Sequence, residues 1–443
     1  MILPCLHASL AFTPFPRIGG MVAIMERSIL AAACRVLRDA AWLTTARVKA
    51  YGRILAVMTL VCSIAWIGLS RGGLDPAGKP LGTDFLSFWA ASELALGGHA
   101  AAAYEPAVHA AAERAVFDGA KFGYAAFFYP PVFLLLCLPL AALPYLASLG
   151  AWLGLTGFAY WCVMRRWLAK AAGPLPILAF PAVLLNTGHG QNAFLSTALF
   201  GGGGLLLARR PLLAGICFGA LAFKPHLAIL IPIALFAAGR WRAIAGAALT
   251  LTALVALSLA AFGAAAWRGF FAASALARIA LEGDSIGAAK MQSLFAAIQL
   301  SGGSVTAAYA GQALLSLGVA ATVWLIARRQ PGHHALGALM IAATLLATPF
   351  LLDYDLLLAA IPLAWIVSAG LKDGFLPWEK TILAAAFVLP LLSRAAAMQF
   401  GIALAPPVLA ALFAIVIRRA LRECNPASDA ELLPVRVIEP RTF

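Results

Sequence analysis

The sequence is poor in charged residues, and acidic residues are the scarcest. Of its 443 residues, 11% are charged and 63% are apolar, with only 18 Asp and Glu. A soluble domain carries about 25% charged and about 45–50% apolar residues, and a water-soluble core of this chain length cannot bury such an excess. The composition therefore excludes an ordinary soluble enzyme and a disordered protein. It predicts an all-α polytopic membrane protein.

Paired cysteines and nucleic-acid-binding motifs are also lacking. The seven cysteines form no CxxC pair, which excludes a disulfide scaffold and gives no metal site. The 32 Lys and Arg residues give a net charge of +14, but no nucleic-acid motif accompanies them, so no nucleic-acid partner is predicted. The excess is instead typical of loops that orient a membrane protein.

Apolar runs occupy most of the chain. Several are shorter than the ~20 residues of a straight membrane span. Short or interrupted helices are tolerated within a membrane where their non-helical backbone faces protein or a water-filled cavity. We predict about twelve transmembrane helices. The apolar runs cover residues 54–70, 131–164, 176–188, 192–207, 211–223, 226–238, 242–262, 304–327, 333–348, 356–370, 377–393 and 401–417.

The distribution of basic residues predicts the orientation. With a cytoplasmic N-terminus and a single crossing in 131–164, cytoplasmic segments hold 23 of the 32 basic residues and the opposite side holds nine. Whether 131–164 crosses once or is a re-entrant helix followed by a span stays open. The predicted division is a cytoplasmic segment 1–53, a transmembrane domain 54–418 with periplasmic loops 71–130 and 263–303, and a cytoplasmic tail 419–443. Helices near 85–97, 104–118 and 267–282 are expected to lie along the membrane surface.

One acidic residue, Asp84, directly follows the first predicted span and precedes an aromatic helical pattern. It is one of ten acidic residues on the predicted periplasmic side, where polar groups near the membrane are functional candidates. Asp84 fits a general base held at the membrane surface. A helix N-cap fits the same position equally well.

Two further polar clusters interrupt short apolar runs. The first contains His189, Gln191 and Asn192, and its unwound backbone is expected to line a cavity, although a polar hairpin loop is an alternative. The second contains Lys224 and His226. A lysine at this place can hold a lipid phosphate as a point charge or can snorkel to the interface.

Three other candidates carry weaker signals. Tyr129 precedes two prolines where the chain re-enters the membrane, which favours an interfacial aromatic anchor over a catalytic role. Asp353 and Asp355 start a later span and could bind a sugar or a cation. A helix cap with the second aspartate facing solvent explains them equally well. A metal pair would need further ligands, so no metal site is predicted.

In order and spacing, these motifs resemble a family formerly called a domain of unknown function and now grouped with bacterial and mycobacterial polyprenol-phosphate-mannose-dependent α-mannosyltransferases. The sequence departs from this pattern at Glu105, where the family often has Asp, and at His226, where it often has Gln. The resemblance rests on Asp84 with Phe88-Trp89, Tyr104-Glu105-Pro106, Tyr129-Pro130-Pro131, Gly190-Gln191-Asn192, Lys224-Pro225 and Asp353-Tyr354-Asp355.

The resemblance implies a glycosyltransferase of the GT-C fold in the bacterial plasma (inner) membrane. Such an enzyme takes a hexose, here mannose, from a polyprenyl-phosphate donor and passes it to a lipid or glycan acceptor on the periplasmic side. Asp84 matches the position of the family's base. Lys224, with His226 or Arg278, would then hold the phosphate, so the reaction needs no metal or other cofactor.

Two other functions compete with this hypothesis. A flippase for a polyprenyl-linked sugar would also contain broken helices within the bilayer, but the sequence has no clear internal repeat and its polar clusters gather on one predicted side. A structural partner in an envelope-assembly complex would leave Asp84 without a task.

Overall fold

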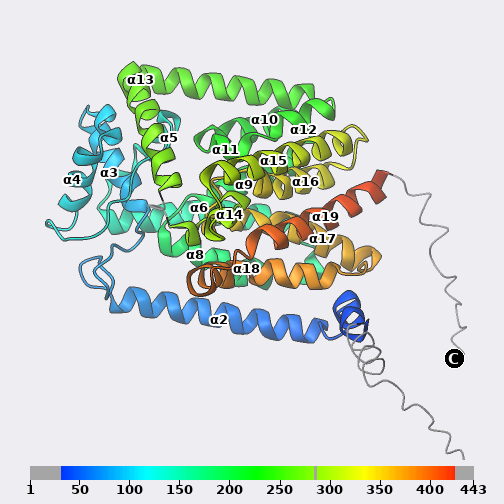
Figure 1. Ribbon diagram of the computed structural model, residues 1–443. Coiled ribbons are helices and arrows are strands. Elements are labelled where there is room, and N and C mark those ends of the chain that lie inside the picture. Colours follow the sequence, from blue (N-terminus) through cyan, green and yellow to red (C-terminus); the bar gives the residue numbers. More distant parts are fainter. Residues whose placement is uncertain (1–30, 284–286, 425–443) are drawn as a thin grey trace, which may run out of the picture.

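The computed structural model describes residues 31–283 and 287–424, and their secondary structure is helical apart from isolated β-bridges (Figure 1). Most of the predicted N-terminal segment, the acidic residue Asp284 and most of the predicted tail lie outside these ranges. The prediction of an all-α protein is confirmed for the described residues.

Within the described residues, six helices are long and apolar enough to cross a membrane. Each has at least 21 residues, and a helix rises about 1.5 Å per residue, so each exceeds the ~30 Å hydrocarbon core. The count of twelve spans stays a prediction, because the other helices are shorter. In chain order the six are α2 (Thr45–Leu69), α6 (Tyr145–Trp167), the Trp241–Ile279 part of α13 (Trp241–Glu282), α15 (Val305–Ala327), η6 with α17 (Asp353–Asp373) and α18 (Glu379–Phe400).

Shorter helices complete the fold, and many of them begin at a proline. Proline suits the first helical turn because its missing N–H has no partner there in any case. The shorter helices include α3 (Phe85–Leu96), η1 (Ala100–Tyr104), α4 (Pro106–Ala115), α5 (Pro131–Cys137), η2 (Leu140–Ala142), η3 (Lys170–Ala172), α7 (Leu175–Ala179), α8 (Pro181–His189), α9 (Ala193–Leu206), α10 (Pro211–Ala220), η4 (Leu221–Phe223), α11 (Pro225–Ala228), α12 (Ile231–Ala237), η5 (Ala288–Lys290), α14 (Leu294–Leu300), α16 (His333–Ala347) and α19 (Ala405–Cys424).

Two predicted boundaries differ in the structure. The first long helix starts at Thr45 rather than at residue 54, because the Thr44 hydroxyl caps it by accepting from the Arg47 backbone N–H. The predicted end of a span at residue 262 is a kink at Gly263, whose φ of 70° favours glycine. The arm of α13 beyond this kink is the helix predicted near 267–282.

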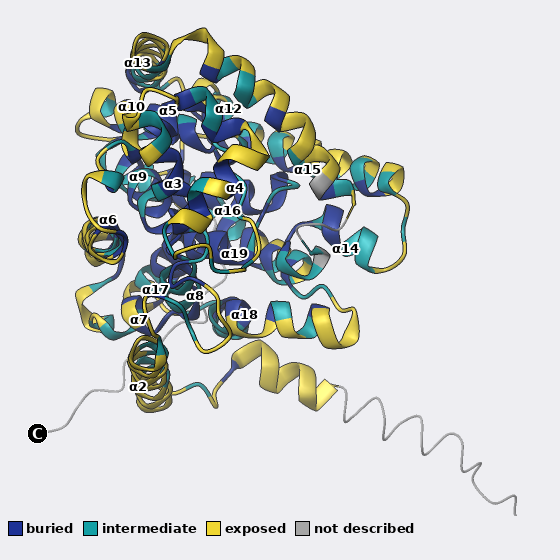
Figure 2. Cartoon of the chain, turned by 90° about the vertical axis from the view of Figure 1, so that its left-hand side faces the viewer, coloured by how far each residue is buried: buried dark blue, intermediate teal, exposed yellow. Residues whose placement is uncertain are grey.

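Helix α16 forms the centre of the bundle, where residues 335–347 are all buried. Helix α2 has no buried residue and lies at the edge of the molecule, where it packs against α7 and α8 (Figures 1 and 2). Helices α3 and α4 lie at the left-hand end in Figure 1, and the described ends of the chain lie at the right. The fold therefore separates the predicted first loop from both described ends of the chain.

Candidate functional site

A cavity of about 950 Å³ opens beside the start of α3. This volume lies at the upper end of the usual range for ligand pockets. Most of the wall is apolar, and five of its twelve Phe and Tyr side chains come from residues 122–129. The charged or amide side chains on the wall include Asp84, Gln191, Lys224, Lys290 and Asp355. The chain thus brings together residues that are far apart in the sequence.

Asp84 directs its carboxylate toward this cavity and not toward the helix that follows it. It occupies the N-cap position of α3 but makes no side-chain capping hydrogen bond. Its Oδ2 accepts from Gln191 Nε2 at 3.0 Å and from Lys290 Nζ at 3.4 Å, and its Oδ1 lies 3.7 Å from His189 Nδ1. With 20% of its side chain exposed, Asp84 remains accessible. The capping hypothesis is therefore wrong.

The surroundings of Asp84 determine its charge. Burial raises the pKa of this carboxyl, but the charges of Lys290 and His189 and the hydrogen bond from Gln191 outweigh the burial, so the pKa lies below its ordinary value. The carboxylate is consequently ionised at neutral pH. An ionised carboxylate can accept a proton.

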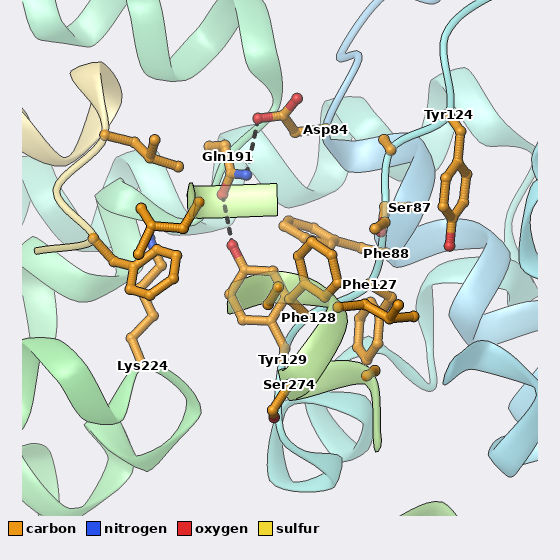
Figure 3. Close-up of a pocket in the computed structure, with 18 of the residues that line it drawn as sticks. Asp84, Ser87, Phe88, Tyr124, Phe127, Phe128, Tyr129, Gln191, Lys224 and Ser274 are labelled. Atoms are coloured by element: carbon orange, nitrogen blue, oxygen red, sulfur yellow. Dashed lines mark hydrogen bonds between the residues drawn. The ribbon is translucent and has the colours of Figure 1, made fainter. Parts of the chain in front are cut away.

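Gly190 brings Gln191 to Asp84. Helix α8 ends at Gly190 in the left-handed conformation, with φ 64°. A Cβ on Gly190 would lie 2.6 Å from Phe85 Cβ, so only glycine allows this close approach. Gln191 then donates to Asp84 and accepts from the Tyr129 hydroxyl at 3.1 Å (Figure 3). The structure thus joins three of the predicted site residues in one hydrogen-bonded chain.

Lys224 forms a buried ion pair on another part of the wall. Its Nζ lies 2.7 Å from Asp355 Oδ1, and the two side chains are only 3% and 1% exposed. The ammonium group also lies 4.9 Å from the centre of the Tyr354 ring, in a cation–π contact. Lys224 does not snorkel to solvent, so that alternative is wrong. Asp355 does not face solvent either, but the helix-cap part of its alternative is confirmed, because its Oδ2 accepts from the Leu352 backbone N–H at 3.4 Å at the start of η6.

The remaining predicted site residues lie around the cavity or behind its wall. His226 lines the cavity, and Arg278 stands at its surface, where it pairs with Glu282 at 3.5 Å. Asn192 is buried and does not line the cavity. Asp353 is also buried away from the wall and pairs with Arg394 at 3.3 Å.

The sequence model of glycosyltransferase family 87 matches residues 127–349, which is half of the chain. The chain belongs to glycosyltransferase family 87. The predicted glycosyltransferase activity is confirmed at this level. The match includes Tyr129, Gln191, Lys224 and Lys290, and Asp84 precedes it. No curated protein and no solved structure matches the chain.

Lys290 of this family 87 glycosyltransferase was missed by sequence reasoning. The residue lies in the second predicted periplasmic loop. The only feature of the sequence that could have indicated it is the position of this single basic residue just before the polar residues Gln292 and Ser293. A β-bridge between Met291 and Leu352 fixes its place. The bridge brings η5 close to Tyr354, so the Lys290 Nζ lies 5.6 Å from the Tyr354 ring centre.

Sequence reasoning also missed a buried pair of side chains, His109 and Glu113, that supports the cavity wall of the glycosyltransferase. His109 Nδ1 lies 3.7 Å from Glu113 Oε1, and both side chains are buried. Glu113 Oε2 accepts from the Ala125 backbone N–H at 3.2 Å, which ties α4 to the aromatic segment of the wall. Burial raises the pKa of Glu113 to about 8 and lowers the pKa of His109 to about 4.

We expect Glu113→Gln to change how the stability of the glycosyltransferase depends on pH. The folded state keeps the Glu113 proton up to pH of about 8, whereas an unfolded chain releases it near the ordinary pKa of 4.5. Wild-type stability should therefore fall as the pH rises toward 8. Tm in detergent, measured at pH 6.5 and pH 8, should fall less in Glu113→Gln. An identical fall in both proteins would contradict this prediction.

Proposed function

We propose that this protein is a GT-C-type hexosyltransferase, and more specifically a mannosyltransferase. It moves the sugar from a polyprenyl-phosphate donor to a lipid or glycan acceptor at the periplasmic face of the bacterial inner membrane. The observation that carries the proposal is the ionised carboxylate of Asp84, which shares one largely apolar cavity with the cations Lys224 and Lys290.

The composition of the cavity wall suits an amphiphilic donor. Apolar and aromatic side chains can contact a prenyl chain, and a cation can stabilise the phosphate as the C1–O bond breaks. The Lys224 ammonium group has three N–H donors, and one of them donates to Asp355. The other donors can bind a phosphate oxygen. His226 lies on the same wall and Arg278 at the surface.

This arrangement supports an inverting single displacement. Asp84 accepts the proton of the acceptor hydroxyl while that oxygen forms a bond to C1 of the sugar. The bond between C1 and the phosphate oxygen breaks on the opposite side, and its electron pair stays with the polyprenyl phosphate. Gln191 orients Asp84, and Tyr129 orients Gln191.

The periplasmic side is supported by charge and by architecture. The predicted topology with cytoplasmic termini places 23 basic residues on the cytoplasmic side and nine on the periplasmic side, which is the expected bias. The end of the bundle that carries α3 and α4 is opposite the described ends of the chain (Figure 1). With cytoplasmic termini, the cavity therefore opens on the periplasmic side.

A panel of donors tests the proposed function. Membranes containing the protein would receive polyprenyl-phosphate mannose, polyprenyl-phosphate glucose or a nucleotide sugar, and mass spectrometry would identify the products. We expect a glycosylated lipid or glycan with polyprenyl-phosphate mannose. A flippase would move the donor without breaking its C1–O bond, so transport without any glycosylated product would contradict the proposal.

A further inference from the structure

Two of the lysines on the cavity wall form ion pairs that differ in length and in burial. Lys224 is almost fully buried and lies 2.7 Å from Asp355, whereas Lys290 is 19% exposed and lies 3.4 Å from Asp84. A buried, short ion pair is costly to separate. A longer and partly solvated ion pair separates more easily. Of these two lysines, Lys290 is therefore the one that an anionic ligand can more readily take from its carboxylate.

The position of Lys290 would allow its ammonium group to bind either Asp84 or a phosphate placed near Tyr354. Its backbone is held by the pairing of Met291 with Leu352 and by a hydrogen bond of 2.7 Å from the Gln292 N–H to the Leu351 carbonyl. Its side chain is flexible and ends on the cavity wall between Asp84 and the Tyr354 ring. Both lysines contact that ring, so a phosphate placed near Tyr354 would lie within the field of both cations.

We propose that Lys290 exchanges its partner, from the carboxylate of Asp84 to the phosphate of the donor. The empty site keeps Asp84 paired, and arrival of the phosphate withdraws the cation and frees the carboxylate to accept a proton. This inference rests on the proposed function. It adds that the donor itself activates the base, which couples donor binding to catalysis and protects the free site from unproductive proton transfer.

The exchange has a consequence for binding that can be measured without turnover. If Lys290 must leave Asp84 to bind phosphate, removing the Asp84 charge should tighten phosphate binding. That gain should depend on Lys290. A direct repulsion between Asp84 and phosphate would also be relieved by the substitution, but it would be relieved whether or not Lys290 is present. A double-mutant cycle distinguishes these two effects.

Binding of farnesyl phosphate to the purified full-length protein in detergent provides the test, with farnesol as the uncharged control. We expect Lys290→Met to weaken farnesyl phosphate binding by about ten- to a hundredfold, the range for a hydrogen bond to a charged group. Asp84→Asn should bind it several-fold tighter than wild type. The double variant should bind like Lys290→Met. Farnesol affinity should be the same in all four proteins.

Lys79→Met is the matched control, because Lys79 is another lysine on the cavity wall and is itself exposed. It should keep wild-type affinity for farnesyl phosphate. The inference is overturned if Lys290→Met binds as wild type does, if Lys79→Met loses as much affinity, or if Asp84→Asn tightens binding equally without Lys290. Failure of every donor in the transfer assay would reject the proposed function separately, because this binding cycle needs no transfer.

Discussion

Replacing Asp84 by asparagine should abolish sugar transfer and leave the fold intact. A positioned base contributes about 10²–10⁴-fold to rate, and an amide cannot take the proton of the acceptor hydroxyl. Asparagine has the same shape, and the native carboxylate makes no helix-capping bond that the substitution would remove. Expression and elution should therefore match wild type, while the transfer rate in purified membranes falls by at least about a hundredfold.

Glu93→Gln provides the control for Asp84→Asn. Glu93 lies on the same helix but is exposed and does not line the cavity. Its amide variant should transfer at the wild-type rate. If Asp84→Asn keeps activity within a few-fold of wild type, Asp84 is not the base. Asp355 would then be the next candidate, because it lines the cavity and Asp353 does not.

Removing the charge of Lys224 should destabilise the protein strongly. Lys224→Met leaves Asp355 as a buried carboxylate without a counterion, and breaking such a pair by removing one partner costs about 3–5 kcal/mol. Replacing both partners, in Lys224→Met with Asp355→Leu, removes the uncompensated charge and should restore most of that stability. Thermal unfolding of the three proteins in one detergent measures this difference.

The same double variant separates the structural task of Lys224 from its proposed task in donor binding. With stability restored, transfer at limiting donor should still be low, because no ammonium group remains at this position to hold the phosphate. Recovery of both stability and donor use would show that the Lys224–Asp355 pair only stabilises the fold.

Much of the helical architecture could be predicted because its causes are local. The helices predicted near 85–97 and 104–118 correspond to α3 and α4, and the apolar run that starts at residue 131 contains α5. The start of α2 was placed too late. There the decisive signal was a threonine cap, and a basic segment such as Arg47–Arg53 extends a helix as readily as it precedes one.

The site could be predicted only in part. Asp84, Gln191 and Lys224 each stood out as a polar residue next to an apolar run, which is a local signal. Their pairings did not: Lys290, which was missed, is 206 residues from Asp84 in the chain, and Asp355, which was named as a separate candidate, is 131 residues from Lys224. Such pairings depend on how helices pack, and a single sequence carries no pattern that specifies them.

The stereochemistry and stoichiometry of one reaction test the central claim most directly. Purified protein would be supplied with polyprenyl-phosphate mannose of known anomeric configuration and an acceptor identified in the membrane assay. We predict that free polyprenyl phosphate and the new mannoside form in equal amounts, and that C1 of the sugar is inverted, as a single displacement assisted by Asp84 requires. Retention at C1, or release of polyprenyl phosphate without an equal amount of mannoside, would contradict the account.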